Sequence, residues 1–150
     1  MLDTRWDQTA YDLHGSENAP SLVLVHGLRL HRGLWRQFLP ALSAHYRALT
    51  YDLYGHGKSG PSTETASLDL YTKQLHGLMN HVGISSATIA GFSLGGMINR
   101  RFARAYSTRF RTGSLSVKAM CSSLDLEMRK GCRQPPPSGI SISRNPSPTV

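Results

Sequence analysis

The pentapeptide Gly-Phe-Ser-Leu-Gly at residues 91–95 constrains the fold of this chain more than any other stretch. It follows a short apolar run, residues 87–90, and precedes apolar residues at helical spacing over 94–102. This serine lies between a strand and a helix, with a glycine two residues before it and another two residues after it. The pattern is typical of a tight turn that leaves no room for a bulky Cβ at those two positions. We expect the Ser93 hydroxyl to stand above the sheet edge at the helix N-terminus, where an oxyanion would be stabilised.

A further glycine, Gly96, follows the pentapeptide, and we expect it to belong to the same turn. Such pentapeptides also arise by chance, in which case the segment is a glycine-rich turn with an inert serine. The rest of the first hundred residues distinguishes these two interpretations.

Strand-like and helix-like patterns alternate along this part of the chain. Strand-like stretches occur at residues 5–14, 22–25, 46–52 and 84–90, and helical periodicity occurs at 34–42, 68–82 and 94–106. This alternation predicts an α/β fold, a mostly parallel sheet with helices on both faces. The working site of such a sheet lies beyond the C-terminal ends of its strands, where loops 26–28 and 52–60 and the Ser93 turn fall.

Local signals define two of the predicted helices. The pattern at 68–82 has Ser67 at a suitable N-cap position and Gly83 just past its end, so it predicts a well-defined helix. Pro40 interrupts the pattern at 34–42, and we expect a kink there or a helix that begins later.

The composition changes after residue 106. The first 93 residues carry seven basic and seven acidic side chains, so the net charge of +8 comes from the rest of the chain. Residues 107–150 are rich in serine and proline and poor in large apolar residues, which is typical of disorder. We therefore expect a truncated α/β core at 1–106 and a basic, low-complexity, disordered tail at 107–150. The abrupt change resembles an altered reading frame or a splice variant.

Several functional classes find no support in the sequence. No apolar stretch approaches the ~20 residues that span a bilayer, and the N-terminus lacks an apolar signal region. Cys121 and Cys132 form no metal-binding pattern, so we expect no metal, no cofactor and a cytoplasmic location without membrane association. The basic tail suggests nucleic-acid binding as an alternative, but residues 111–150 lack aromatic side chains for base stacking, so we expect none.

Three ordered motifs resemble the N-terminal half of the α/β-hydrolase fold superfamily. They are Val-His-Gly-Leu at 25–28, followed by Trp35; Tyr-Asp-Leu-Tyr-Gly-His-Gly-Lys-Ser at 51–59; and Gly-Phe-Ser-Leu-Gly-Gly-Met at 91–97. The resemblance covers residues 6–106 and is closest to the esterase and enol-lactonase branch. It implies a serine hydrolase that acts on small carboxylic esters or lactones by acyl transfer.

The resemblance also implies roles for individual residues. Ser93 matches the nucleophile, and the backbone N–H groups of Leu28 and Leu94 match the two donors of the oxyanion hole. The elbow and turn glycines are Gly91, Gly95 and Gly96. His26 and His56 are expected to fix loops by hydrogen bonding.

The chain departs from the family in one respect. The family's catalytic triad runs Ser, then Asp or Glu, then His, yet all seven histidines here precede Ser93. Only two acids, Asp125 and Glu127, follow the serine. Because serine is a weak nucleophile without an adjacent base, the site is expected to be incomplete. The alternative is a non-catalytic, truncated or frame-altered product with at most a binding role; the oligomeric state and the substrate stay open.

Overall fold

The sheet that organises this protein has five strands in the order β1-β2-β4-β3-β5. The computed structural model describes residues 4–111. The strands are β1 (Thr4–Trp6), β2 (Thr9–His14), β3 (Ser21–Val25), β4 (Arg47–Tyr51) and β5 (Thr88–Gly91). β3 pairs in parallel with both β4 and β5, whereas β2 runs antiparallel to β4 and β1 antiparallel to β2. The mostly parallel α/β sheet expected from the sequence is confirmed.

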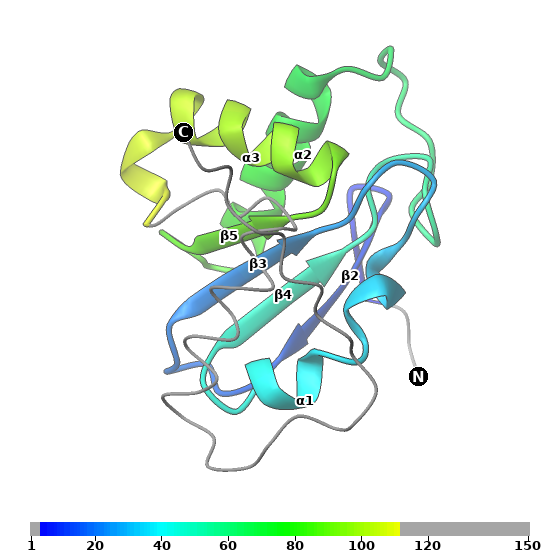
Figure 1. The fold of residues 1–150 in the computed structure, drawn as a ribbon. Helices are drawn as coiled ribbons and strands as arrows, with labels where there is room; N and C mark the ends of the chain where they lie inside the picture. The colour runs from blue at the N-terminus through cyan, green and yellow to red at the C-terminus, as the bar shows by residue number, and fades with distance from the viewer. Residues whose placement is uncertain (1–3, 112–150) are drawn as a thin grey trace, which may run out of the picture.

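Helices cover both faces of the sheet (Figure 1). α2 (Leu68–His81) and α3 (Leu94–Ala105) pack on one face, and the 3-10 helix η1 (Arg32–Trp35) and α1 (Leu39–Leu42) pack on the other. Side chains of β3 alternate between these two cores: Val23 and Val25 join the first, and Leu22 and Leu24 join the second. A strand buried on both faces must be apolar at successive positions, which explains its continuous run of aliphatic residues.

The structure refines several predicted boundaries. The stretch at 5–14 is a hairpin and not one strand, because Asp7 (φ 41°) and Gln8 (φ 61°) turn the chain between β1 and β2. The helix expected near Leu34 begins only at Leu39, where Pro40 lies in the first turn and its missing N–H removes no helical hydrogen bond. α2 begins as predicted, since Ser67 Oγ accepts the Leu70 N–H at 3.1 Å.

β5 begins at Thr88, later than the predicted start at residue 84. The intervening residues belong to the connection from α2, in which the Ile84 N–H donates to the carbonyl of Met79. Beyond the boundary expected at residue 106 the chain continues with η2 (Ser107–Arg109), and Phe110 forms a parallel bridge with Ala87. Residues 112–150 of the expected disordered tail lie outside the described residues.

Candidate active site

Ser93 occupies the connection between β5 and α3, at the C-terminal end of the strand. Its backbone has φ 52° and ψ −112°, a conformation that residues other than glycine rarely adopt. The turn is closed by hydrogen bonds from Gly95 N–H to Phe92 O (2.8 Å) and from Gly96 N–H to Ser93 O (2.9 Å). The serine is exposed, and its side chain makes no capping bond to α3. The predicted strand–turn–helix setting of Ser93 is therefore confirmed.

Two of the three predicted turn glycines are needed for close backbone packing. A Cβ on Gly91 would lie 2.3 Å from the carbonyl carbon of Gly95, and a Cβ on Gly95 would lie 2.2 Å from the carbonyl oxygen of Val25. Both contacts are far shorter than real Cβ atoms show, and both involve backbone that has little freedom to move. A Cβ on Gly96 would meet its nearest neighbour, the Gly91 oxygen, at an ordinary 3.7 Å, so packing does not require glycine there.

The loop after β3 lies directly against the Ser93 turn. The Phe92 N–H donates to Val25 O at 2.9 Å, and a Cβ on Gly27 would lie 3.4 Å from the Cβ of Ser93. Within residues 4–111, neither the Leu28 N–H nor the Leu94 N–H donates to any acceptor. Two adjacent loops thus bring a serine hydroxyl and two unused backbone donors to one edge of the sheet, an arrangement suited to an oxyanion.

Asp52 fixes the loop that carries Leu28 to the neighbouring loop after β4. This carboxylate, 1% exposed, accepts the backbone N–H groups of Arg32 (2.6 Å) and Lys58 (2.9 Å) and pairs with the Arg32 guanidinium. Arg32 also bonds Asp12 on β2 at 2.5 Å. The sequence placed Asp52 at the start of the loop 52–60 but gave no role to Arg32, because nothing in the pattern pairs residues 20 positions apart.

His26 is buried and uses both ring nitrogens to hold these loops. The Leu53 N–H donates to Nε2 at 3.0 Å, so Nδ1 carries the proton and donates to Gly27 O at 2.8 Å. Burial lowers the pKa of His26 below its ordinary value, which favours this neutral ring. The expected loop-fixing role of His26 is confirmed. His56 acts in the same way, through a 2.9 Å bond from Nδ1 to Tyr54 O.

Three of the other described histidines also have local roles. His31 caps η1, His76 stacks on Tyr106 with ring centroids 4.0 Å apart, and His81 bonds the Tyr11 hydroxyl at 3.1 Å. Across the described part of the chain, no hydrogen bond reaches Ser93 Oγ. Asp125 and Glu127, the acids that follow the serine, lie outside the described residues.

Asn99, in the second turn of α3, is a site residue that sequence analysis missed. It is fully buried beneath the serine turn. With its amide oriented to satisfy both groups, the nitrogen donates to Gly95 O at 3.0 Å and the oxygen accepts the Gly91 N–H at 2.9 Å. Asn99 therefore joins the two glycines that flank Ser93. The only sequence signal for this role is a polar residue on the apolar side of the helix.

Two other kinds of feature, a metal site and a membrane-spanning helix, are absent from the described residues. Residues 4–111 contain no group of three or more His, Cys, Asp or Glu side chains placed to hold a metal ion. Over the same residues, no helix has the length and apolar character needed to cross a membrane.

Comparison with known proteins extends the sequence resemblance. The α/β hydrolase fold family model matches residues 20–136, which reaches 30 residues beyond the boundary that the three motifs indicated. The chain is 32% identical over 98 residues to 3-oxoadipate enol-lactonase 1 of Acinetobacter baylyi, covering 65% of this chain and 36% of that protein. It is 34% identical to the dihydrolipoyllysine-residue acetyltransferase component of an acetoin cleaving system from Pseudomonas putida, covering 70% of this chain and 28% of the relative.

Solved structures show the same similarity. The enol-lactonase of Burkholderia xenovorans superimposes with a TM-score of 0.66 at 31% identity, covering 70% of this chain and 42% of the enzyme. The chain thus spans about a third of the length of the curated relatives it matches. The family match covers most of the 150 residues. The chain therefore belongs to the α/β-hydrolase fold family.

Proposed function

We propose that this chain carries the nucleophile and oxyanion half of a serine hydrolase site for carboxylic esters or lactones. Ser93 Oγ attacks the carbonyl carbon while a base takes its proton, and the carbonyl oxygen becomes an oxyanion. The N–H groups of Leu28 and Leu94 donate to that oxyanion. Collapse of the tetrahedral intermediate expels the alkoxide, which takes up a proton, and water then hydrolyses the acyl-serine.

One observation carries this proposal: a serine in a left-handed conformation stands beside two backbone donors that have no acceptor among the described residues. Strained backbone at an exposed polar side chain is more typical of a reactive site than of an inert turn. The enol-lactonase names of the relatives supply the ester and lactone substrate class. Exposed apolar side chains near the turn, Leu28 (62% exposed) and Met97 (54% exposed), suit an apolar acyl group.

No histidine within residues 4–111 hydrogen-bonds to Ser93, so the described residues supply no general base for this proposed site. His26, the histidine closest in sequence to the oxyanion loop, is neutral and has both nitrogens occupied, so it has no free lone pair for the serine proton. We propose that the chain as given turns over esters slowly or not at all. An external base of imidazole type then accelerates acylation, because it supplies the base that none of residues 4–111 provides.

Labelling with a fluorophosphonate probe tests this proposal. We expect mass spectrometry of the wild-type chain to place the adduct on Ser93, at a rate that rises with added imidazole. Ser93→Ala is expected to stay unlabelled, and Ser62→Ala, at a serine in a different loop, to label like wild type. Equal labelling of wild type and Ser93→Ala would refute the proposal and favour the alternative, a non-catalytic product with at most a binding role.

A further inference from the structure

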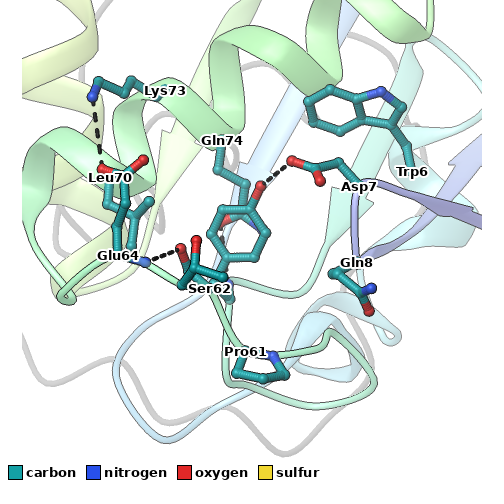
Figure 2. A pocket seen from close by; sticks show the side chains of 11 residues that line it. Trp6, Asp7, Gln8, Pro61, Ser62, Glu64, Leu70, Lys73 and Gln74 are labelled. Carbon is teal, nitrogen blue, oxygen red and sulfur yellow. Dashed lines mark hydrogen bonds and ion pairs between the residues drawn. The ribbon is translucent and has the colours of Figure 1, made fainter.

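A hollow lies on the β1 side of the sheet, away from β5, the strand that leads into the Ser93 turn. It has a volume of about 270 Å³ and is formed by the β1–β2 turn, the loop after β4 and the first turns of α2 (Figure 2). Neighbouring strands are about 4.8 Å apart, and the walls of the hollow come from β1 and from the loop after β4, which lie four and two steps from β5, so the hollow is roughly 10–20 Å from the serine turn. The proposed hydrolase site does not use it.

The aromatic walls of the hollow are Trp6 and Tyr54, and each is held in place. Gly77 leaves space for the Trp6 ring, since a Cβ there would lie 2.3 Å from Trp6 Cη2. The Tyr54 N–H donates to the buried Gln74 Oε1 at 3.2 Å, and Gln74 Nε2 in turn bonds Thr9 and the Asp52 carbonyl. These contacts make the hollow a preformed feature of the fold.

The turn that closes the hollow is held in an unusual conformation. Asp7 and Gln8 both have positive φ although neither is glycine, which strains the backbone. The Gly60 N–H donates to Gln8 O at 2.8 Å and ties this turn to the loop after β4. The Tyr54 hydroxyl donates to Asp7 Oδ2 at 2.7 Å, and Figure 2 shows the Asp7 side chain beside Trp6.

The charge of the hollow is opposite to that of the chain. Two carboxylates, Asp7 and Glu64, face one ammonium group, Lys73, in a protein whose net charge is +8. Burial, with the bond to Asp7, raises the pKa of Tyr54 to about 12, so its hydroxyl stays protonated and directs the Asp7 carboxylate. Lys73 lies 3.8 Å from Glu64, but both side chains are more than 60% exposed, and such pairs separate easily.

We propose that this hollow binds a small organic cation, an ammonium head group that lies against Trp6, on the side of its ring away from His81, and against Tyr54, and that is paired with Asp7. Aromatic faces attract cations through the negative potential of the ring, and tryptophan does so most strongly. A carboxylate beside two such rings is the chemistry that recognises quaternary or primary ammonium groups. The first turn of α2 opposes a cation only weakly, because Ser67 Oγ already accepts the Leu70 N–H.

Choline and its neutral isostere, 3,3-dimethyl-1-butanol, test the proposal. The chain has two tryptophans, Trp6 in the hollow and Trp35 buried in the core on the other face of the sheet. We expect choline to shift the indole N–H resonance of Trp6 in the ¹⁵N-labelled full chain, with saturation at millimolar concentration, and to leave that of Trp35 unchanged. Trp6→Phe assigns the two resonances.

Asp7→Asn is the discriminating variant, since asparagine keeps an acceptor for Tyr54 and tolerates positive φ. We expect it to weaken choline binding about fivefold or more, as expected when a nearby charge partner is lost. Glu17→Gln, which removes an equal charge from a distant exposed turn, is expected to leave affinity within twofold. An unchanged Trp35 resonance shows that each variant is folded. Equal shifts from choline and the alcohol, no shift with either, or unchanged affinity in Asp7→Asn would overturn the proposal.

Discussion

Replacing Gly95 by alanine is expected to be one of the most damaging single-methyl changes in the described fold. The new Cβ would lie 2.2 Å from Val25 O and 2.8 Å from His26 O, both backbone atoms at the end of β3. Ordinary contacts begin near 3.4 Å, so α3 must move away from the sheet by about 1 Å. Overpacking of a core typically costs about 1–3 kcal/mol, and a clash between two backbones belongs at or above the upper end. A loss of about 3 kcal/mol corresponds to roughly 10–20 °C in Tm for a domain of this size.

Gly96→Ala is the matched control, one residue further along the same helix. Its Cβ would meet its nearest neighbour at 3.7 Å, and alanine is the better helix former by about 0.5–1 kcal/mol. We expect this variant to melt at the same temperature as wild type or a few degrees higher. Urea unfolding of the three proteins, followed by far-UV circular dichroism, measures both effects. Similar losses for Gly95→Ala and Gly96→Ala would refute the packing argument.

Three further predictions concern the residues around the site. Ser93→Gly is expected to raise the free energy of unfolding by about 1 kcal/mol, because glycine adopts φ 52° without strain; a lower melting temperature would show that the turn is unstrained. Asp52→Ala is expected to cost about 3 kcal/mol in urea unfolding, since it removes the acceptor of two backbone N–H groups and one of the two carboxylates that bind Arg32, whereas Asp69→Ala, which breaks the exposed pair with Arg101, should change far less. Burial lowers the pKa of His26, so below pH 6.5 this residue binds a proton more readily in the unfolded chain than in the folded chain. The free energy of unfolding of the wild type should therefore fall as the pH drops below 6.5. His26→Gln should be less stable at about pH 8 but show a flatter urea midpoint between pH 6.5 and 5; parallel curves would exclude His26 as the cause.

Patterns local in sequence predicted the fold well. The alternation of apolar strands and amphipathic helices gave the parallel core because β3 is apolar at successive positions and α2 has a distinct N-cap at Ser67. The glycines around Ser93 predicted the turn because a close backbone approach leaves a direct mark on the sequence. Gly96 shows the limit of this reasoning, since it continues the pattern without a steric need for glycine.

Interactions between distant residues were not predictable in the same way. The Arg32–Asp52–Asp12 network joins residues from three separate segments, and no periodicity connects them. The hairpin turn at Asp7 and Gln8 lacks the glycine or asparagine that usually marks positive φ, so residues 5–14 resembled one strand. The hollow at Trp6 and Tyr54 was not predicted either. Its walls come together only when β1, the loop after β4 and α2 are folded.

The crystal structure of the chain after reaction with a methyl fluorophosphonate tests the central claim most directly. We predict a phosphorus–oxygen bond to Ser93 Oγ, with one phosphoryl oxygen about 2.7–3.1 Å from the backbone nitrogens of both Leu28 and Leu94. An adduct on Ser93 whose oxygens point only to solvent, or an adduct on another residue, would contradict the claim that these two loops form an oxyanion hole around a reactive serine.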